Sequence, residues 1–556
     1  MNPETKNCES CKMDFVIETD DFSFYEKMGV LPPKKCPDCR SQLRLNFRNE
    51  RSFYKRECDK CKKPFIGQFS SNKTYPVWCH DCWFADDWSG KDFALEYDPS
   101  RPFLEQWKEL WESVPKPGTI STRDEGCEYV NYVADNKHCY FLIESSNNED
   151  AIHCYWIQLS KDLVDCSYTQ KVERSYDSDD CYDSYNLKYC KGAHSCTDSA
   201  FLLNSRGCMN CLGCINLRQQ QYCIFNEQYT KEEYEKKLAE YRLDTHSGVE
   251  KFRKEFEAFI AGKPRKFAEI YNVLNSTGNY MTNVKNVRHS FHSYDAEECA
   301  YSIHAWRGAK ECVDCNTAGR GAELLYNTMN TGLDAANIVC GSFCWGSQFM
   351  DYCVNCPDSQ NALGCVGYRK AKYAILNKPY EKDEYEKLRA EIIEKMKQEG
   401  VYGEFYPPEF SAFGYNETSA MIEYPLTKEE ALSKGFKWED TPRGTFGKAT
   451  IAWADVPDSI GKTSPDIVKE IFECTKCQKN YRVIGNEFSF YQKCGIPLPR
   501  LCPECRHERR IVARGPNKLW HRKCMNSGCE NEFETNYAPE RPEILYCEDC
   551  YQKEIL

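Results

Sequence analysis

The feature that most constrains this 556-residue chain is a spaced set of cysteine pairs that occurs twice, once near each end. The three intervals between successive pairs are identical in the two copies, and only the Cys524–Cys529 knuckle departs from Cys-x2-Cys. Two thiolates on one knuckle and two on another complete a tetrahedral S4 shell, so we predict about four structural zinc ions. The predicted zinc ligands are Cys8, Cys11, Cys36, Cys39, Cys58, Cys61, Cys79, Cys82, Cys474, Cys477, Cys502, Cys505, Cys524, Cys529, Cys547 and Cys550.

The residues between the knuckles also recur. The pattern Phe-Ser-Phe-Tyr-x-Lys-x-Gly stands at 22–29 and again at 488–495, and each copy continues into Cys-Pro-x-Cys-Arg, at 36–40 and 502–506. These marks resemble the bacterial family described as a probable zinc-ribbon, or treble-clef-like, domain. The resemblance implies a zinc fold at each end of the chain. The wider layout is similar to uncharacterised cysteine-rich proteins of ultra-small, uncultured bacteria.

The middle of the chain shows a regular cysteine spacing. Cys127, Cys154, Cys181 and Cys208 are equally spaced, and a second series, beginning at Cys139, has nearly the same intervals. Short Tyr-, Ile- and Leu-rich runs separated by Asn, Asp, Ser and Gly predict a parallel β-solenoid with one coil per repeat and small cysteines in its interior. One subset leaves a further metal site open: Cys208, Cys211, Cys214 and Cys223.

A second half repeats the first. The pattern from Gly213 to Lys236 reappears from Gly364 to Lys387, and Val164-Asp165 matches Val313-Asp314. We therefore predict a mainly β protein, a duplicated parallel β-solenoid with capping helices, flanked by tandem zinc-ribbon or treble-clef modules at each terminus. The predicted segments are a zinc module (1–95), an aromatic connector (96–126), solenoid half 1 (127–229), capping helices (230–275), solenoid half 2 (276–380), a helix (381–398), a Pro/aromatic connector (399–473) and a second zinc module (474–556).

Composition limits the compartment and the partners. The chain has no long apolar run and its first residues are polar, so we expect a cytoplasmic protein without a membrane span. In a reducing compartment, its 36 cysteines indicate metal ligands and buried thiols rather than disulfides. The net charge of −12 speaks against nucleic acid as a partner of the whole chain, so basic surface must be local.

In each copy, one row of three arginines follows the second cysteine knuckle. At spacings of four positions they share one helix face, and such a row suits phosphate groups. The alternative is a solvated face paired with Glu50, Glu57 and Glu508. The predicted nucleic-acid contacts are Arg40, Arg44, Arg48, Arg506, Arg510 and Arg514.

These features predict a non-enzymatic zinc scaffold that docks on RNA, DNA or a nucleoprotein. The first alternative is a scaffold with the same fold and only protein partners. The second is a carbohydrate-active solenoid enzyme, which requires convergent carboxylates in a cleft. The acidic run at 177–183 fits that requirement, but solvated turns explain it as well. No catalytic motif is recognisable, so we predict no catalytic residues.

Overall fold

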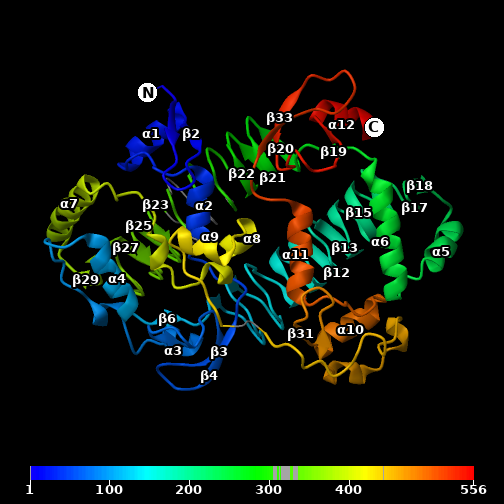
Figure 1. The fold of residues 1–556 in the computed structure, drawn as a ribbon, viewed down its shortest axis with the longest axis horizontal. Coiled ribbons are helices and arrows are strands. Elements are labelled where there is room, and N and C mark those ends of the chain that lie inside the picture. The colour runs from blue at the N-terminus through cyan, green and yellow to red at the C-terminus, as the bar shows by residue number, and fades with distance from the viewer. Residues whose placement is uncertain are drawn as a thin grey trace.

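The computed structural model describes residues 2–304, 310–311, 313–314, 326–329, 336–441 and 444–555. Helices and short strands alternate along this part of the chain (Figure 1). The α-helices are α1 (Thr19–Met28), α2 (Pro37–Leu45), α3 (His80–Phe84), α4 (Phe103–Ser113), α5 (Lys231–Glu240), α6 (His246–Ala261), α7 (Lys382–Gln398), α8 (Ser419–Glu423), α9 (Lys428–Ser433), α10 (Gly485–Cys494), α11 (Pro503–Arg514) and α12 (Glu548–Ile555).

A parallel ladder occupies residues 121–228, which we call the first ladder. Its main sheet keeps one constant offset between parallel partners, the offset that separates Tyr155 from Ser167. Its strands are β7 (Ser121–Thr122), β8 (Val133–Ala134), β9 (Glu149–Ile152), β10 (Tyr155–Gln158), β11 (Lys161–Val164), β12 (Ser167–Tyr176), β13 (Tyr182–Lys188), β14 (Lys191–His194), β15 (Thr197–Arg206), β16 (Leu212–Ile215), β17 (Cys223–Ile224) and β18 (Glu227–Gln228).

The backbone of the first ladder repeats at every third position. From Arg123 to Phe225, every third residue has a positive φ, including bulky residues such as Trp156 and Tyr168. A left-handed residue turns the chain, so no side of the ladder is longer than a few residues. The inward side chains share this period: every third residue from Cys139 to Cys214 is buried. Between a strand residue and its parallel partner on the next strand, the chain therefore places four side chains in the interior.

The second ladder spans the described parts of 270–379 and has the same register. Its paired strands keep the offset of the first ladder, as Met350 and Ala362 do, apart from the first pair, where Ile270 meets Met281. The isolated bridges Ala300–Val313 and Met329–Ser342 also depart from this offset, by one residue. Its strands are β20 (Ile270–Leu274), β21 (Gly278–Lys285), β22 (Ser290–Tyr294), β23 (Ala336–Ile338), β24 (Gly341–Ser342), β25 (Gln348–Asp351), β26 (Cys353–Val354), β27 (Gln360–Leu363), β28 (Lys372–Ile375) and β29 (Lys378–Pro379).

The predicted fold class is wrong. The described residues form twelve α-helices and many short sheets, a mixed composition in which no closed solenoid stands out. The predicted coil, which spans the interval from Cys127 to Cys154, is also wrong, because parallel partners such as Tyr155 and Ser167 lie much closer in the sequence. The cysteine intervals are multiples of three, so they follow the inward period of the backbone and not the length of a turn. The helices predicted in the segment 230–275 are present as α5 and α6, and α5 begins with a capping box between Thr230 and Glu233.

Two helices, α5 and α6, cover one side of the first ladder. Phe252 of α6 contacts Phe201 and Phe225, with ring centroids 4.9 and 5.2 Å apart. On the other half of the molecule, Trp107 of α4 stacks on Tyr406 of the connector at 4.3 Å. These aromatic contacts bury the apolar faces of the helices and join distant segments of the chain into common cores.

The two ends of the chain also add short strands to the middle. The hairpin strands are β1 (Glu4–Asn7), β2 (Asp14–Ile17), β3 (Tyr54–Glu57), β4 (Pro64–Gly67), β30 (Phe472–Glu473), β31 (Asn480–Tyr481), β32 (Trp520–Lys523) and β33 (Glu532–Thr535). In each terminal region a further strand pairs in parallel outside its hairpin, β5 (Val77–Trp78) with β6 (Lys116–Pro117), and β34 (Leu545–Tyr546) with β19 (Arg265–Lys266).

Candidate metal centres

Each tetra-cysteine group joins a knuckle on a hairpin to a knuckle at the start of a helix. In the first group, Cys8 and Cys11 lie between β1 and β2, and Lys12 turns the hairpin with φ 62°. Cys36 is the residue before α2 and Cys39 lies in its first turn. A proline at the start of α2 suits a helix that begins there, because its missing N–H would have no partner. Local sequence therefore places all four thiols.

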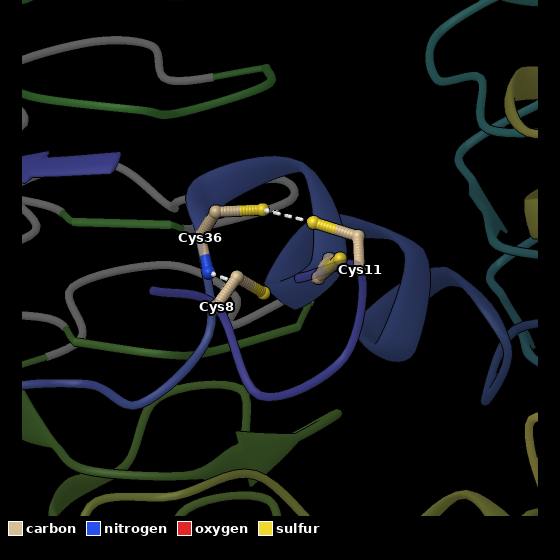
Figure 2. A group of neighbouring side chains, drawn as sticks. Cys8, Cys11 and Cys36 are labelled. Atoms are coloured by element: carbon tan, nitrogen blue, oxygen red, sulfur yellow. Dashed lines mark hydrogen bonds between the residues drawn. The ribbon is translucent and has the colours of Figure 1, made fainter. Parts of the chain in front are cut away.

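The sixteen predicted ligands come together in four groups of four. Within each group the sulfur atoms all lie within 4.8 Å of one another. Figure 2 shows the thiols of Cys8, Cys11 and Cys36 meeting, with 3.7 Å between the sulfurs of Cys11 and Cys36. The corresponding distances in the other groups are 3.8, 3.6 and 3.8 Å, for Cys61–Cys79, Cys477–Cys502 and Cys529–Cys547.

Backbone N–H groups in these knuckles point at sulfur. Cys36 N–H donates to Cys8 Sγ at 3.2 Å, and Cys79 and Cys502 donate likewise to Cys58 and Cys474. Burial raises the pKa of the Cys8 thiol, but hydrogen bonds from the backbone of Cys11, Cys36 and Ser10 outweigh burial and lower it to about 6.

The other three groups share this property. Each contains one thiol whose pKa is lowered to about 7, namely Cys58, Cys474 and Cys547. Metal binding requires the thiolate form, and each group offers one thiolate near neutral pH.

The residues fit a closed tetrahedral metal site. A tetrahedral zinc ion with Zn–S bonds of ~2.3 Å separates its sulfurs by about 3.8 Å, which matches the observed distances. Four thiolates leave no open position for a water, so the chemistry these groups can supply is structural. The geometry shows that the groups can hold metal ions, and thiolate ligands favour zinc among the common structural metals.

The knuckle with two extra residues forms the same kind of group. Cys524 N–H donates to the carbonyl of Asn531 at 2.8 Å, and Cys529 N–H to that of Asn526 at 3.1 Å. The insertion turns at Gly528, whose φ is 79°, a value that glycine adopts without strain. The two extra residues are therefore accommodated in the turn, and Cys529 still lies beside the other three thiols of its group.

The structure places the six predicted phosphate-binding arginines in the interior. Their exposed fractions are 5% or less. In α11, Arg506 Nε lies 2.7 Å from Asp165 Oδ2, and Arg510 Nη1 lies 3.1 Å from Asp177 Oδ1. Asp177 belongs to the acidic run that the carbohydrate-active alternative would use for catalysis. In the structure its carboxylate instead forms an ion pair with Arg510.

The remaining arginines are paired as well. Arg40 of α2 pairs with Asp314, and Arg44 Nη1 donates to Asn327 Oδ1 at 2.7 Å. Arg48, which follows α2, pairs with Glu50 and Glu144, and Arg514, the last residue of α11, pairs with Glu423. The six side chains form neither a phosphate-facing row nor a solvated face in this structure, because carboxylates inside the protein surround them.

These ion pairs connect the modules crosswise. The N-terminal helix α2 reaches Asp314 in the second half, and the C-terminal helix α11 reaches Asp165 in the first half. Burial lowers the pKa of Arg506, but Asp165, Tyr491 and Glu487 outweigh burial and raise it above its usual value. Sequence reasoning missed these carboxylates as partners, although the repeat of Val-Asp at 164 and 313 marked both.

The cysteines inside the ladders behave as packing residues. Cys196 Sγ donates to the carbonyl two positions before it at 3.3 Å, and Ser199, the next inward residue, does the same with its hydroxyl at 2.8 Å. Among the described residues, Cys208, Cys211, Cys214 and Cys223 do not meet the 4.8 Å criterion that the four knuckle groups meet. Cysteine and serine therefore fill equivalent inward positions.

Comparison with models of known protein families finds no match, and comparison with curated protein sequences finds none either. The four tetra-cysteine groups are consistent with zinc-ribbon-like modules on their geometry alone. Among the described helices, none has the length and apolar character needed to cross a bilayer.

Proposed function

We propose that the protein is a non-enzymatic, zinc-stabilised scaffold whose partners are proteins. The observation that carries this proposal is the closed set of four thiols in each tetra-cysteine group, which leaves no site for an activated water. Each tetra-cysteine group would hold one zinc ion, so each terminal module would hold two. Zinc then supplies folding energy, on the order of 10–16 kcal/mol in small zinc modules.

The zinc-ribbon or treble-clef character of the modules belongs to the same proposal. A knuckle hairpin followed by a helix that starts at the second knuckle supports it, as in β1–β2 with α2 and in β30–β31 with α11. The modules hold the two halves together, because the helix of each reaches buried carboxylates in a ladder distant in sequence.

Protein partners are favoured over RNA or DNA by two observations. The six arginines that would contact phosphates are buried and engaged with protein groups, and the chain carries a net charge of −12. Binding to nucleic acid depends on accessible cations that release counterions from phosphates. We therefore expect no binding of single-stranded RNA or double-stranded DNA in fluorescence anisotropy at low salt. Salt-sensitive binding of either nucleic acid would contradict this proposal and support the nucleic-acid prediction instead.

Elemental analysis tests the metal part. We expect about four zinc ions per chain, and about three in the Cys36→Ser, Cys79→Ser or Cys502→Ser variant, because a site with three thiolates binds zinc less tightly. The interior variant Cys166→Ser serves as a control and keeps four, since Cys166 lies in the ladder. Iron in place of zinc, or two metal ions per chain, would contradict the proposal.

A further inference from the structure

A groove of about 620 Å³ separates the two ladders on one side of the molecule. One wall is a column of the first ladder, in which register partners follow one another from strand to strand: Gln170, Tyr182, His194, Arg206 and Arg218. Small-molecule sites in proteins have volumes of roughly 300–1,000 Å³, so the groove has the size of a ligand site.

The second ladder supplies the facing wall. Tyr271 pairs in register with Thr282, and Thr282 with Tyr294, on the neighbouring strands β20, β21 and β22. The hydroxyls of Tyr182 and Tyr294 meet at 2.7 Å and close one end of the groove. Toward the other end, the Arg206 guanidinium lies over the ring of Tyr271, 4.8 Å from its centroid. Tyr271 is 54% exposed, so this end opens to solvent.

Two like charges stand side by side in the groove without an acidic partner. Arg206 and Arg218 are direct register partners, and like charges placed opposite each other on adjacent strands repel. Within the described residues, neither guanidinium forms an ion pair with a carboxylate. Arg218 donates to the carbonyls of Asn204 and Leu217 at 2.7 and 2.9 Å. The Nε of Arg206 is buried and has no hydrogen-bond partner.

Other charged groups line the groove, but within the described residues none of them forms an ion pair with Arg206 or Arg218. Burial and the two arginines lower the pKa of His194 to about 3, so the imidazole is neutral. Asp183 at the lip lies 3.7 Å from Lys171, and Asp295 accepts a hydrogen bond from Asn283 at 2.9 Å. The groove therefore keeps a site for an anion at its Arg206–Arg218 end.

The rest of the lining is polar and uncharged. Gln170, Gln219, Asn283 and Thr282 offer amide and hydroxyl groups along the walls. Such groups donate to and accept from hydroxyls, and the tyrosine rings add apolar faces of the kind that pack on sugar rings. We propose that this groove binds a small phosphorylated sugar, with its phosphate between the Arg206 and Arg218 guanidiniums and its hydroxyls against the two walls.

Isothermal titration calorimetry on the full-length, metal-loaded protein tests the proposal with glucose 6-phosphate, inorganic phosphate and glucose as probes. Glucose 6-phosphate should bind about tenfold more tightly than either of the others, because it engages both parts of the groove. Arg206→Ala should weaken it roughly ten- to a hundredfold, the usual effect of losing a charge-assisted hydrogen bond. A matched control is Arg174→Ala: Arg174 lies on the same ladder over Tyr185, at 5.3 Å, outside the groove, and its loss should leave binding unchanged.

Hydrogen exchange supplies a second measurement that needs no variant. Glucose 6-phosphate should protect backbone amides of β13–β15 and of β20–β22 in the wild-type protein. Protection elsewhere, no binding of glucose 6-phosphate, or equal binding by the wild-type and the folded Arg206→Ala protein would overturn the proposal. Hydrogen exchange of β13–β15 in the unliganded Arg206→Ala protein, unchanged from wild type, checks that the ladder is folded.

Discussion

The ion pair between Arg506 and Asp165 should control how firmly α11 is attached to the first ladder. Both side chains are buried, with exposed fractions of 1% and 0%, and their charged atoms lie 2.7 Å apart. Replacing Asp165 by asparagine leaves the buried Arg506 guanidinium, among the described residues, with Glu487 at 3.2 Å as its one remaining charged partner. Removing one partner of a buried pair costs roughly 3–5 kcal/mol, and the remaining contact places this case at the lower end.

A local assay suits this prediction, because a chain with several cores does not unfold in two states. Amide hydrogen exchange along α11 reports the free energy of local opening. A loss of about 3 kcal/mol raises the opening equilibrium by about 100-fold, since 1.4 kcal/mol corresponds to a factor of ten. We therefore expect Asp165→Asn to speed exchange in α11 by about two orders of magnitude, with the zinc content unchanged.

The control is Glu149→Gln on the same ladder. Glu149 pairs with Lys161 at 3.0 Å, but both side chains are nearly half exposed, and such pairs contribute at most about 1 kcal/mol. Exchange in α11 should not change in this variant. A double variant, Asp165→Asn with Arg506→Gln, should cost less than the sum of the single changes, because the two residues interact directly. Exchange in Asp165→Asn within a factor of about five of wild type would refute the reasoning.

Three further outcomes follow from single residues. Cys196→Ser should lower stability by no more than about 1–2 kcal/mol in thermal melting and leave zinc content unchanged, since Ser199 makes the same carbonyl contact; a lost zinc ion would contradict this. Burial raises the pKa of Glu487, but His153 and Arg506 outweigh it and lower the pKa from 4.5 to about 2, so its charge stabilises the fold above pH 4.5 and this contribution is lost as the pH falls through about 2. Glu487→Gln should therefore cost about 3 kcal/mol at pH 7 and progressively less below pH 4.5, measured as local opening by amide exchange along α10, and a cost independent of pH would refute it. Leu159 is 48% exposed with φ 51°, so Leu159→Asn should raise the melting temperature by relieving about 1 kcal/mol of left-handed strain, and a lower melting temperature would count against that reading.

The sequence was sufficient to group the metal ligands. The chain repeats the same cysteine spacing at both ends, and a knuckle such as Cys8–Cys11 is a local structure that a few residues dictate. The capping box at Thr230 and Glu233 was predictable for the same reason, because its two hydrogen bonds join residues three apart. Features that depend only on residues close together in the sequence could therefore be predicted from the sequence.

The ladders could be predicted from the sequence only in part. The inward period of three was already present in the sequence, since Cys127, Cys154 and Cys181 are separated by multiples of three. The offset between parallel partners could not be predicted, because it depends on a left-handed residue at every third position. Most of these residues are not glycine, and side chains such as Trp156 give no local sign of that conformation.

The destination of the arginines was decided by tertiary structure. Spacing placed Arg506 and Arg510 on one helix face, but it could not show whether that face meets water, a phosphate or a carboxylate. The partner of Arg506 lies 341 positions earlier, at Asp165 (506 − 165). A helix exposes or buries its charged face according to what packs against it, and that packing is set by the whole chain. The sequence thus determined which cysteines assemble, and the tertiary structure determined that the modules bind the ladders through buried ion pairs.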